Sequence, residues 1–304
     1  MYETSQNSIT DFSKEDFFVN ENFEIDKFPT HFLVVEKKRN IEKHLRKTRR
    51  TLGDLQNILY AHAKYSVLIC VQGMDNSGKD SMVREVFKDF NVRGVTSYSF
   101  KKPSEKELKH DFLWRHYKVL PERGKYAVFN RSHYENVLIS RVRPQIVLNE
   151  NLPSIQSVED IPSDFWDKRL EQINNFESHI TNNGCIVMKF YLHISEEEQR
   201  KRLLKRLRDP KKNWKFEASD ISERKLWGDY QEVYEEVMRK SSFEHAPWYC
   251  IPADDKASAR YFVAKIILET MQQYTDIQNP KMSQEVKENL SKYKKILQNP
   301  LENS

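Results

Sequence analysis

The residues from Gly73 to Asp80, with the sequence GMDNSGKD, have the spacing that most clearly predicts chemistry. A glycine, four intervening residues and then Gly78-Lys79 is typical of a loop whose backbone N–H groups surround phosphate. Because the chain has only 7 glycines, this spacing has little chance of arising at random. We predict that Lys79 reaches the transferred phosphoryl group. The other residues that we expect around the phosphates are Gly73, Asn76, Ser77 and Gly78. The alternative is a tight turn that carries a surface lysine.

Asp80 stands where such a loop normally has Ser or Thr, whose hydroxyl binds Mg²⁺. Asp75 lies in the same loop, and two carboxylates beside phosphate repel one another unless a cation or a proton intervenes. We therefore predict that Asp75, Asp80 or both hold Mg²⁺, with Mn²⁺ as the other candidate ion. The alternative for Asp80 is an exposed acid that the positive end of the following helix stabilises.

A second motif, NRSHYEN, begins at Asn130 directly after the apolar run YAVF. Arg131 suits phosphate because its guanidinium can bind two oxygens at once. Asn130 can hold a metal-bound water but adds no charge, so the charge beside a metal must come from the loop aspartates or Glu135. We interpret His133 as a packing or hydrogen-bonding residue, because a phosphate nucleophile is already ionised and needs no general base.

A strongly basic segment, RKRLLKRLRDPKKNWK, occupies residues 200–215 and contains nine Lys or Arg residues and one acid. After the fourth strand of a phosphate-binding domain, such a segment predicts a lid over about residues 197–217 that closes on phosphates. The lid residues that we single out are Arg202, Arg206, Arg208 and Lys212. The alternatives are a solvated charged face and a nucleic-acid site. No recognition module accompanies the cations, so we expect no nucleic-acid partner.

The elements that must position these motifs are five short apolar runs, separated by helical stretches. Continuous apolar runs suit strands that are buried on both faces, so the pattern predicts an α/β fold with a five-stranded parallel sheet covered by helices. Helices are expected from Lys38 to about Ala63, over 163–183, and after capping boxes at Ser104–Glu107 and Ser195–Glu198. The five runs are 66–71, 95–100, 126–130, 185–192 and 248–252.

The composition favours a soluble protein with a local basic site. The net charge of +5 comes from 50 basic and 45 acidic residues, which is too mild for a generally cationic protein. Cys70, Cys185 and Cys250 lack metal-site spacing and lie in apolar runs, so we expect buried thiols and a reducing compartment. No stretch of about 18 apolar residues occurs, so we expect no membrane association and a cytoplasmic location.

Six segments together resemble the second polyphosphate kinase family, in consistent order over about residues 35–275. They are GMDNSGKD, SFKKPSEKELKHDFLWR, FNRSHYENVLISRV, FWDKRLEQINNFE, NWKF and APWYCIPADDK. The resemblance implies a three-layer α/β/α P-loop kinase fold, similar to thymidylate kinase, with a basic helical lid. It also implies Mg²⁺-dependent transfer from inorganic polyphosphate to a nucleotide. FNRSHYE is similar to the third subclass, which accepts AMP and ADP. Family members are often homodimers or homotetramers.

The resemblance also implies roles for individual residues. Lys79 and Arg131 match the residues that bind the phosphates, and Asp75 matches the aspartate implicated with Mg²⁺; Asp80 belongs to the same signature. Glu135 stands at a position that distinguishes the subclasses, where we expect it to help place the nucleotide phosphate or its metal. Asn130 replaces the Asp of the other subclasses. We also predict phosphate binding by Lys101 and Lys102 of the SFKKP segment.

The chain is thus expected to form an N-terminal arm (1–35), a P-loop kinase domain (36–275) and a helical tail (276–304) that packs or oligomerises. Two functions compete with a polyphosphate:AMP/ADP phosphotransferase. One is an ATP-dependent nucleoside monophosphate kinase, which shares the loop and the lid. The other is a phosphate or nucleic-acid binder without activity. GMP and GDP are further candidate acceptors.

Overall fold

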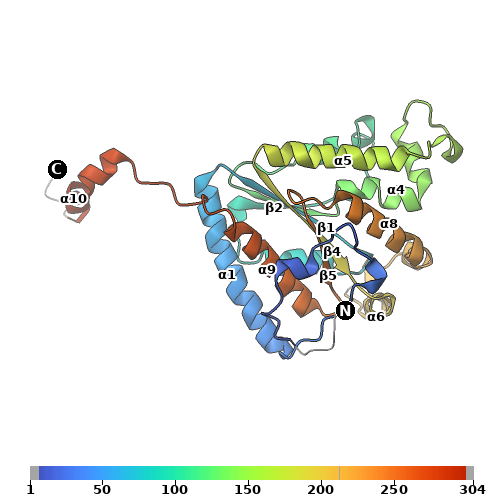
Figure 1. Ribbon diagram of the computed structural model, residues 1–304, viewed down its shortest axis with the longest axis horizontal. Helices are drawn as coiled ribbons and strands as arrows, with labels where there is room; N and C mark the ends of the chain where they lie inside the picture. The colour runs from blue at the N-terminus through green and yellow to red at the C-terminus, as the bar shows by residue number, and fades with distance from the viewer. Residues whose placement is uncertain (1–6, 212, 299–304) are drawn as a thin grey trace.

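The computed structural model, which describes residues 7–211 and 213–298, is built on a five-stranded parallel sheet with the strand order β2-β3-β1-β4-β5 (Figure 1). Each predicted apolar run forms a strand, with ends that differ by at most one residue. The α/β prediction is therefore confirmed. The strands are β1 Ser66–Gln72, β2 Val95–Ser99, β3 Tyr126–Asn130, β4 Cys185–His193 and β5 Trp248–Pro252.

Helices cover both faces of the sheet, which gives the predicted three layers (Figure 1). On one face, α1 (Lys38–His62) packs along α9 (Lys256–Gln272), and α2 (Lys79–Val86) also contacts α9. On the other face, α5 (Phe165–Asn182) packs on β4 and against α8 (Trp227–Ser241). Every residue of β1, β3, β4 and β5 is buried, which explains why these strands are continuously apolar.

The remaining helices lie mostly around the ends of the strands. They are α3 Trp114–Tyr117, α4 Ile139–Val142, α6 Glu196–Arg208, α7 Ser219–Arg224 and α10 Gln284–Gln298. Short 3-10 turns are η1 Lys14–Phe17, η2 Ile25–Lys27, η3 Val92–Gly94, η4 Glu107–Lys109, η5 His133–Asn136, η6 Pro144–Glu150, η7 Val158–Asp160 and η8 Asn213–Lys215.

The two predicted capping boxes differ in outcome. At Ser195 the hydroxyl accepts from the N–H of Glu198 at 3.1 Å and begins α6, but the Glu198 carboxylate turns to Arg202 instead of back to Ser195. At Ser104 the reciprocal contacts with Glu107 form, yet only the short turn η4 follows. The helix predicted there is wrong, because Asp111 accepts the next backbone N–H groups and starts a separate turn.

The N-terminal arm, as far as it is described, packs on the β5 side of the sheet (Figure 1). Phe12, Phe17 and Phe32 form an aromatic cluster with Phe262 of α9. The N–H of Val19 donates to the carbonyl of Trp248 at 3.0 Å, so the arm also touches the backbone of β5. The phenylalanines of the arm therefore pack both on α9 and at the edge strand β5.

The tail helix α10 stands away from the body of the molecule (Figure 1), and the described part of the chain buries none of its residues. Leu297, on the apolar face predicted from the sequence, is 80% exposed. The three cysteines are free and buried, as expected. Among the described residues, no helix combines the length and apolar character needed to cross a membrane.

Candidate active site

The phosphate loop connects β1 to α2 at the carboxyl edge of the sheet. Gly73 has a φ of 146° and Gly78 a φ of 106°, values that residues with a side chain rarely adopt. A Cβ added at Gly73 would lie 2.8 Å from the hydroxyl of Ser77 and 2.9 Å from the carbonyl oxygen of Leu192. Both glycines are therefore required for the tight loop that the sequence predicts.

Lys79 is buried at the start of α2, and its ammonium folds back over the loop. Nζ donates to the carbonyl oxygens of Gly73 at 2.6 Å and Met74 at 3.2 Å. Burial, together with repulsion by Arg131, lowers the pKa of Lys79 to about 8, although the loop acids and Glu135 oppose this shift. The lowered pKa shows that the neighbouring acids only partly offset the cost of burying this charge. A phosphate beside Lys79 would stabilise the ammonium further.

The second motif lies beside the loop because β3 is the neighbour of β1, with Asn130 opposite Val71. Arg131 donates from Nη2 to the Asp75 carboxylate at 2.9 Å. Asn130 donates from Nδ2 to the Asp80 carboxylate at 2.6 Å. The fold thus brings together residues of two motifs that lie 50 and 56 positions apart in these two pairs, and the amide of Asn130 orients the carboxylate of Asp80.

The two loop acids fit a cation that is shared with a substrate. Among the described residues, no three Asp, Glu, His or Cys side chains converge into a cage for a metal. Mg²⁺ at phosphoryl-transfer sites commonly uses one or two carboxylates, with waters and substrate phosphates as its other ligands. Asp80 is exposed and Asp75 is half-buried, so both carboxylates can face such an ion. Arg131 already neutralises part of the charge on Asp75.

A buried network supports the second motif from below. Nε2 of His133 lies 3.0 Å from Oε1 of Glu177, whose other oxygen accepts from Lys189 Nζ at 2.5 Å. Lys189 also donates to the hydroxyl of Tyr134 at 2.8 Å. The interpretation of His133 as a packed, hydrogen-bonding residue is confirmed. Sequence reasoning missed Glu177 and Lys189, although a lysine inside the apolar run 185–192 was a visible signal.

Glu135 is half-buried, and burial raises its pKa despite the opposing influence of Arg131 and Lys79. Lys101 and Lys102 are exposed and lie just beyond Ser99, which pairs with Asn130 across β2 and β3. The carbonyl of Lys101 accepts from Arg115, a buried guanidinium that the sequence did not single out. These side chains therefore lie on the second-motif side of the loop.

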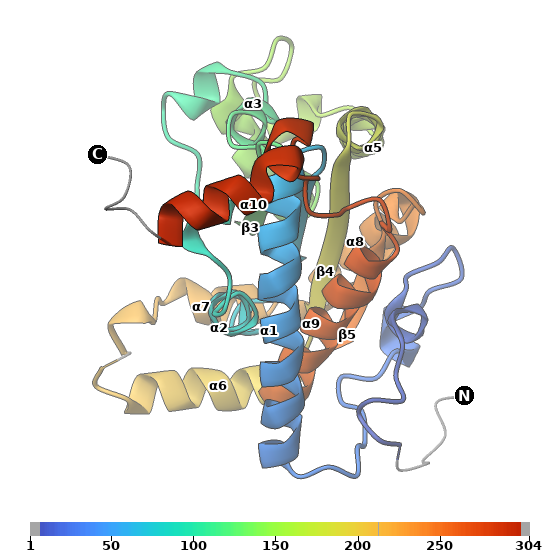
Figure 2. The same cartoon turned by 90° about the vertical axis from the view of Figure 1, so that its left-hand side faces the viewer.

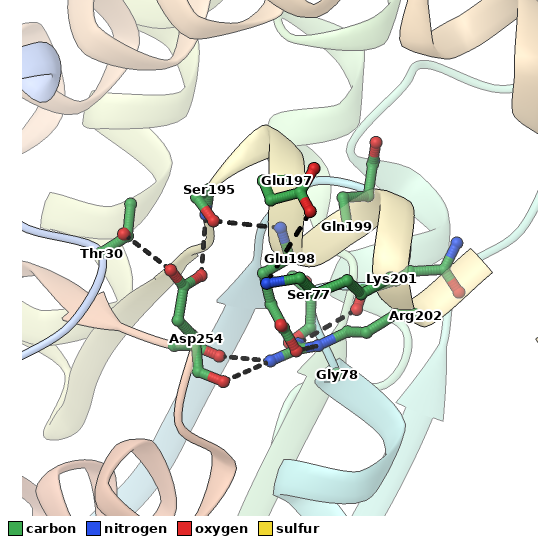
Figure 3. Close-up of polar contacts among 12 residues, drawn as sticks. Thr30, Ser77, Gly78, Ser195, Glu197, Glu198, Gln199, Lys201, Arg202 and Asp254 are labelled. Atoms are coloured by element: carbon green, nitrogen blue, oxygen red, sulfur yellow. Dashed lines mark hydrogen bonds and ion pairs between the residues drawn. The ribbon is translucent and has the colours of Figure 1, made fainter. Parts of the chain in front are cut away.

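Arg202, one of the residues that we single out in the predicted lid, lies in α6, but its guanidinium is turned into the protein. Arg202 is buried, and every N–H of its guanidinium donates to an acceptor within the protein (Figure 3). Instead of facing a ligand, it joins the phosphate loop to the connection between β5 and α9. Its acceptors are the carboxylate of Glu198 and the carbonyls of Asn76, Ser77, Ala253 and Asp254.

The outer lid residues are placed differently. Arg208 is exposed at the end of α6, and the half-buried Arg206 lies 3.7 Å from Asp220 of α7. Lys212 lies outside the described residues. Gln199 of α6 donates to the carbonyl of Asp75 at 2.9 Å and accepts from Arg224 of α7 at 2.6 Å. The segment predicted to form a lid is therefore connected to the phosphate loop through Gln199, a side chain that sequence reasoning missed.

A phosphate loop, a buried lysine, an arginine on the neighbouring strand and a basic lid define a P-loop enzyme that transfers phosphoryl groups. The family model described as Polyphosphate kinase 2 matches residues 35–280. The chain belongs to the polyphosphate kinase 2 family.

Similar proteins agree with this assignment. An "ADP-polyphosphate phosphotransferase" of Rhodopseudomonas palustris is 46% identical, over 83% of this chain and 86% of the relative. An "AMP/ADP-polyphosphate phosphotransferase" of Meiothermus ruber is 43% identical, over 73% of this chain and 78% of the relative. The crystal structure of polyphosphate kinase 2 from Arthrobacter aurescens TC1 has a TM-score of 0.82 and 31% identity, and the match covers 94% of this chain and 97% of that one.

Proposed function

We propose that this phosphotransferase moves the terminal phosphoryl group of inorganic polyphosphate to AMP and ADP. The observation that carries the proposal is the meeting of the Lys79 loop with Arg131 and Asn130, which belong to the segment FNRSHYE. The relative from R. palustris is named for ADP and polyphosphate, and the relative from M. ruber for AMP, ADP and polyphosphate. Both names support polyphosphate as the donor and these nucleotides as acceptors.

In the proposed reaction, an oxygen of the acceptor's last phosphate attacks the terminal phosphorus of the donor. The bond from that phosphorus to its bridging oxygen breaks, and the electron pair stays on the polyphosphate, which becomes one unit shorter. Lys79 and Arg131 neutralise charge on the transferred group as it moves. Both cations are already held at the loop by carbonyls and by Asp75, so little reorganisation is needed.

Asp75 and Asp80 are the residues that would hold Mg²⁺. When bound, the ion would draw off negative charge from the phosphates and help to align the two substrates. Asn130 then acts as a positioning residue, because its hydrogen bond fixes the Asp80 carboxylate. Glu135 lies beside these groups, where burial raises its pKa against the opposing influence of Arg131 and Lys79, and we assign it to placing the acceptor phosphate or its metal.

The experiment that tests the function uses purified protein with polyphosphate as the sole donor and Mg²⁺ present. AMP, ADP, GMP and GDP are compared as acceptors, and ATP with AMP is assayed in parallel. Formation of ADP and ATP from polyphosphate supports the proposal. Transfer from ATP to AMP without any use of polyphosphate would overturn it in favour of a nucleoside monophosphate kinase.

Substitution of the two phosphate-binding cations tests the site. Lys79→Ala or Arg131→Ala should each lose ~2–4 kcal/mol of transition-state stabilisation, as found for other preorganised charge donors. The measurement is kcat/KM for polyphosphate at saturating ADP. Arg131→Lys, which keeps the charge but loses the planar guanidinium, should recover part of the loss. Turnover close to that of the parent in Lys79→Ala would refute the role of Lys79.

The exposed apolar face of α10 supports the further proposal that the chain forms a homodimer or homotetramer. Val286, Leu290, Tyr293 and Leu297 lie at helical spacing along this face. Light scattering of the full chain after size separation, beside a Leu290→Glu, Leu297→Glu variant, tests this. A monomeric parent would reject it.

A further inference from the structure

A second basic cluster lies against the phosphate loop, on the side opposite to Arg131. Lys256 and Arg260 come from the first turns of α9 and line a small cavity together with Ser77, Gly78 and Ser81. The Cε of Lys256 is 3.9 Å from the position that a Cβ on Gly78 would occupy. Both cations therefore lie directly beside the loop that receives phosphate.

The positive charge of this cluster is not balanced within the protein. Within the described ranges, neither Lys256 nor Arg260 forms an ion pair, and the buried Nε of Arg260 has no hydrogen-bond partner. The nearby acids are engaged elsewhere: Glu85 accepts from Arg84, and Asp255 accepts from Ser258. A pair of cations facing a cavity without an acid of its own suits an anionic ligand.

The electrostatics of Lys256 agree with this geometry. Its pKa is lowered to about 8, first by burial and then by repulsion from Arg202 and Arg260, with a further contribution from Lys205. Glu198 opposes the shift, but its carboxylate accepts from Arg202. An anion bound at the cavity would relieve this mutual repulsion.

The sheet order places the two basic sites on opposite sides of the loop. Arg131 follows β3 and Lys256 follows β5, and these strands lie on the two sides of β1, which leads into the loop. In-line transfer also puts the acceptor and the leaving group on opposite sides of the moving phosphorus. If the acceptor phosphate lies beside Arg131 and Glu135, the leaving group lies towards Lys256.

We propose that Lys256 and Arg260 bind the inner phosphates of the polyphosphate donor, the part of the chain that leaves after transfer. This assignment rests on the proposed function and adds the path of the donor. Two cations beside the loop suit a donor whose negatively charged chain continues past the transferred phosphoryl group. The uncharged base of a nucleotide donor would leave them uncompensated.

Kinetics with donors of different length test the assignment. Lys256→Gln, Arg260→Gln and the double variant are compared with the parent, using long-chain polyphosphate and tripolyphosphate at saturating ADP. The KM for long chains should rise roughly fivefold to twentyfold in the double variant, as expected for two partly exposed charge contacts. The KM for ADP should stay unchanged. Tripolyphosphate should be less affected, because fewer of its phosphates reach the cluster.

Two further variants separate the local contact from general effects. Lys256→Arg keeps the charge and should recover most of the KM increase seen in Lys256→Gln. Lys287→Gln with Lys292→Gln on α10 removes the same net charge at a distance from the loop, and should also retain it. Lys256 is the more accessible of the two side chains, so Lys256→Gln keeps the test valid even if Arg260→Gln folds poorly.

Each outcome decides one question. An unchanged KM for long chains in the double variant would overturn the donor path, as would a rise in the KM for ADP alone. A parent that uses ATP but not polyphosphate would instead overturn the proposed function. In that case, calorimetric titration of long-chain polyphosphate into the parent and the double variant still reports on the cluster, and equal affinities would reject it as a polyanion site.

Discussion

The two halves of the basic segment that begins in α6 have the same kind of sequence but different surroundings. In the first half, Arg202 and Leu203 are buried, and Arg202 donates to the carbonyls of Asn76 and Ser77 in the phosphate loop. In the second half, Arg208 is exposed at the end of the helix, and Trp214, beyond it, is 73% exposed. Figure 2 shows α6 projecting away from the sheet before the chain returns to α7. The comparison teaches that one run of cations can combine an internal anchor with an end that is exposed to solvent.

The anchored half should respond most to the loss of Arg202. Arg202→Met keeps much of the buried volume but leaves four carbonyls and one carboxylate without this donor. We expect a loss of about 3–5 kcal/mol in the free energy of unfolding. Urea denaturation measures it. Arg208→Met, at the exposed end of the same helix, is the matched control, and equal stability of the two variants would remove the distinction between the halves.

Acid should lower the free energy of unfolding through His193, the last residue of β4, whose carbonyl accepts from the N–H of Ala253 next to the acceptors of Arg202. Burial lowers the pKa of His193 to about 4, whereas an unfolded histidine titrates near 6.5. The contribution of His193 to the free energy of unfolding is therefore fully present above pH ~6.5. It falls as the pH drops towards 4, because the unfolded chain binds the proton more readily. We expect a loss of roughly 2 kcal/mol between pH 7 and pH 5.

The measurement is urea denaturation of the parent and of His193→Phe at both pH values. The variant should lose less stability on acidification, with a remainder from His116, whose pKa burial also lowers. An identical pH dependence in the two proteins would show that His193 does not contribute.

The exposed half should respond in activity instead of stability. Arg208→Ala removes a cation at the end of α6 and should lower kcat/KM for polyphosphate by about fivefold, with an unchanged urea midpoint. Steady-state kinetics at low and high salt measure the effect, which salt should reduce. An Arg208→Ala variant that is destabilised but fully active would show that this half contributes to stability and not to activity.

The smallest effect is expected at Arg200, an exposed side chain that pairs with Glu197 at 2.8 Å. Exposed pairs of this kind contribute little. Arg200→Ala should match the parent in urea midpoint and in KM for polyphosphate. A clear loss of activity would extend the ligand surface to this face of α6.

Patterns that are local in sequence could be predicted well. Buried parallel strands are continuously apolar, and the phosphate loop has a fixed spacing, so the sheet and the place of Lys79 followed from the sequence. The role of Arg202 could not be predicted, because its acceptors come from two loops, at 76–77 and 253–254, that meet only in the folded chain. The cavity beside Lys256 and Arg260 could not be predicted either, because its walls come from the phosphate loop with α2, from β4, and from the connection between β5 and α9.

The N-terminal arm has a consequence for the solubility of the protein. β5 lies at an edge of the sheet, where unpaired backbone groups can recruit strands from other molecules. The arm covers this edge with Phe18 beside Tyr249 and with the hydrogen bond from Val19 to Trp248. A chain shortened to begin at residue 36 would expose both the strand edge and the aromatic surface around Phe262. The shortened chain should therefore aggregate under conditions in which the phosphate loop still keeps its structure.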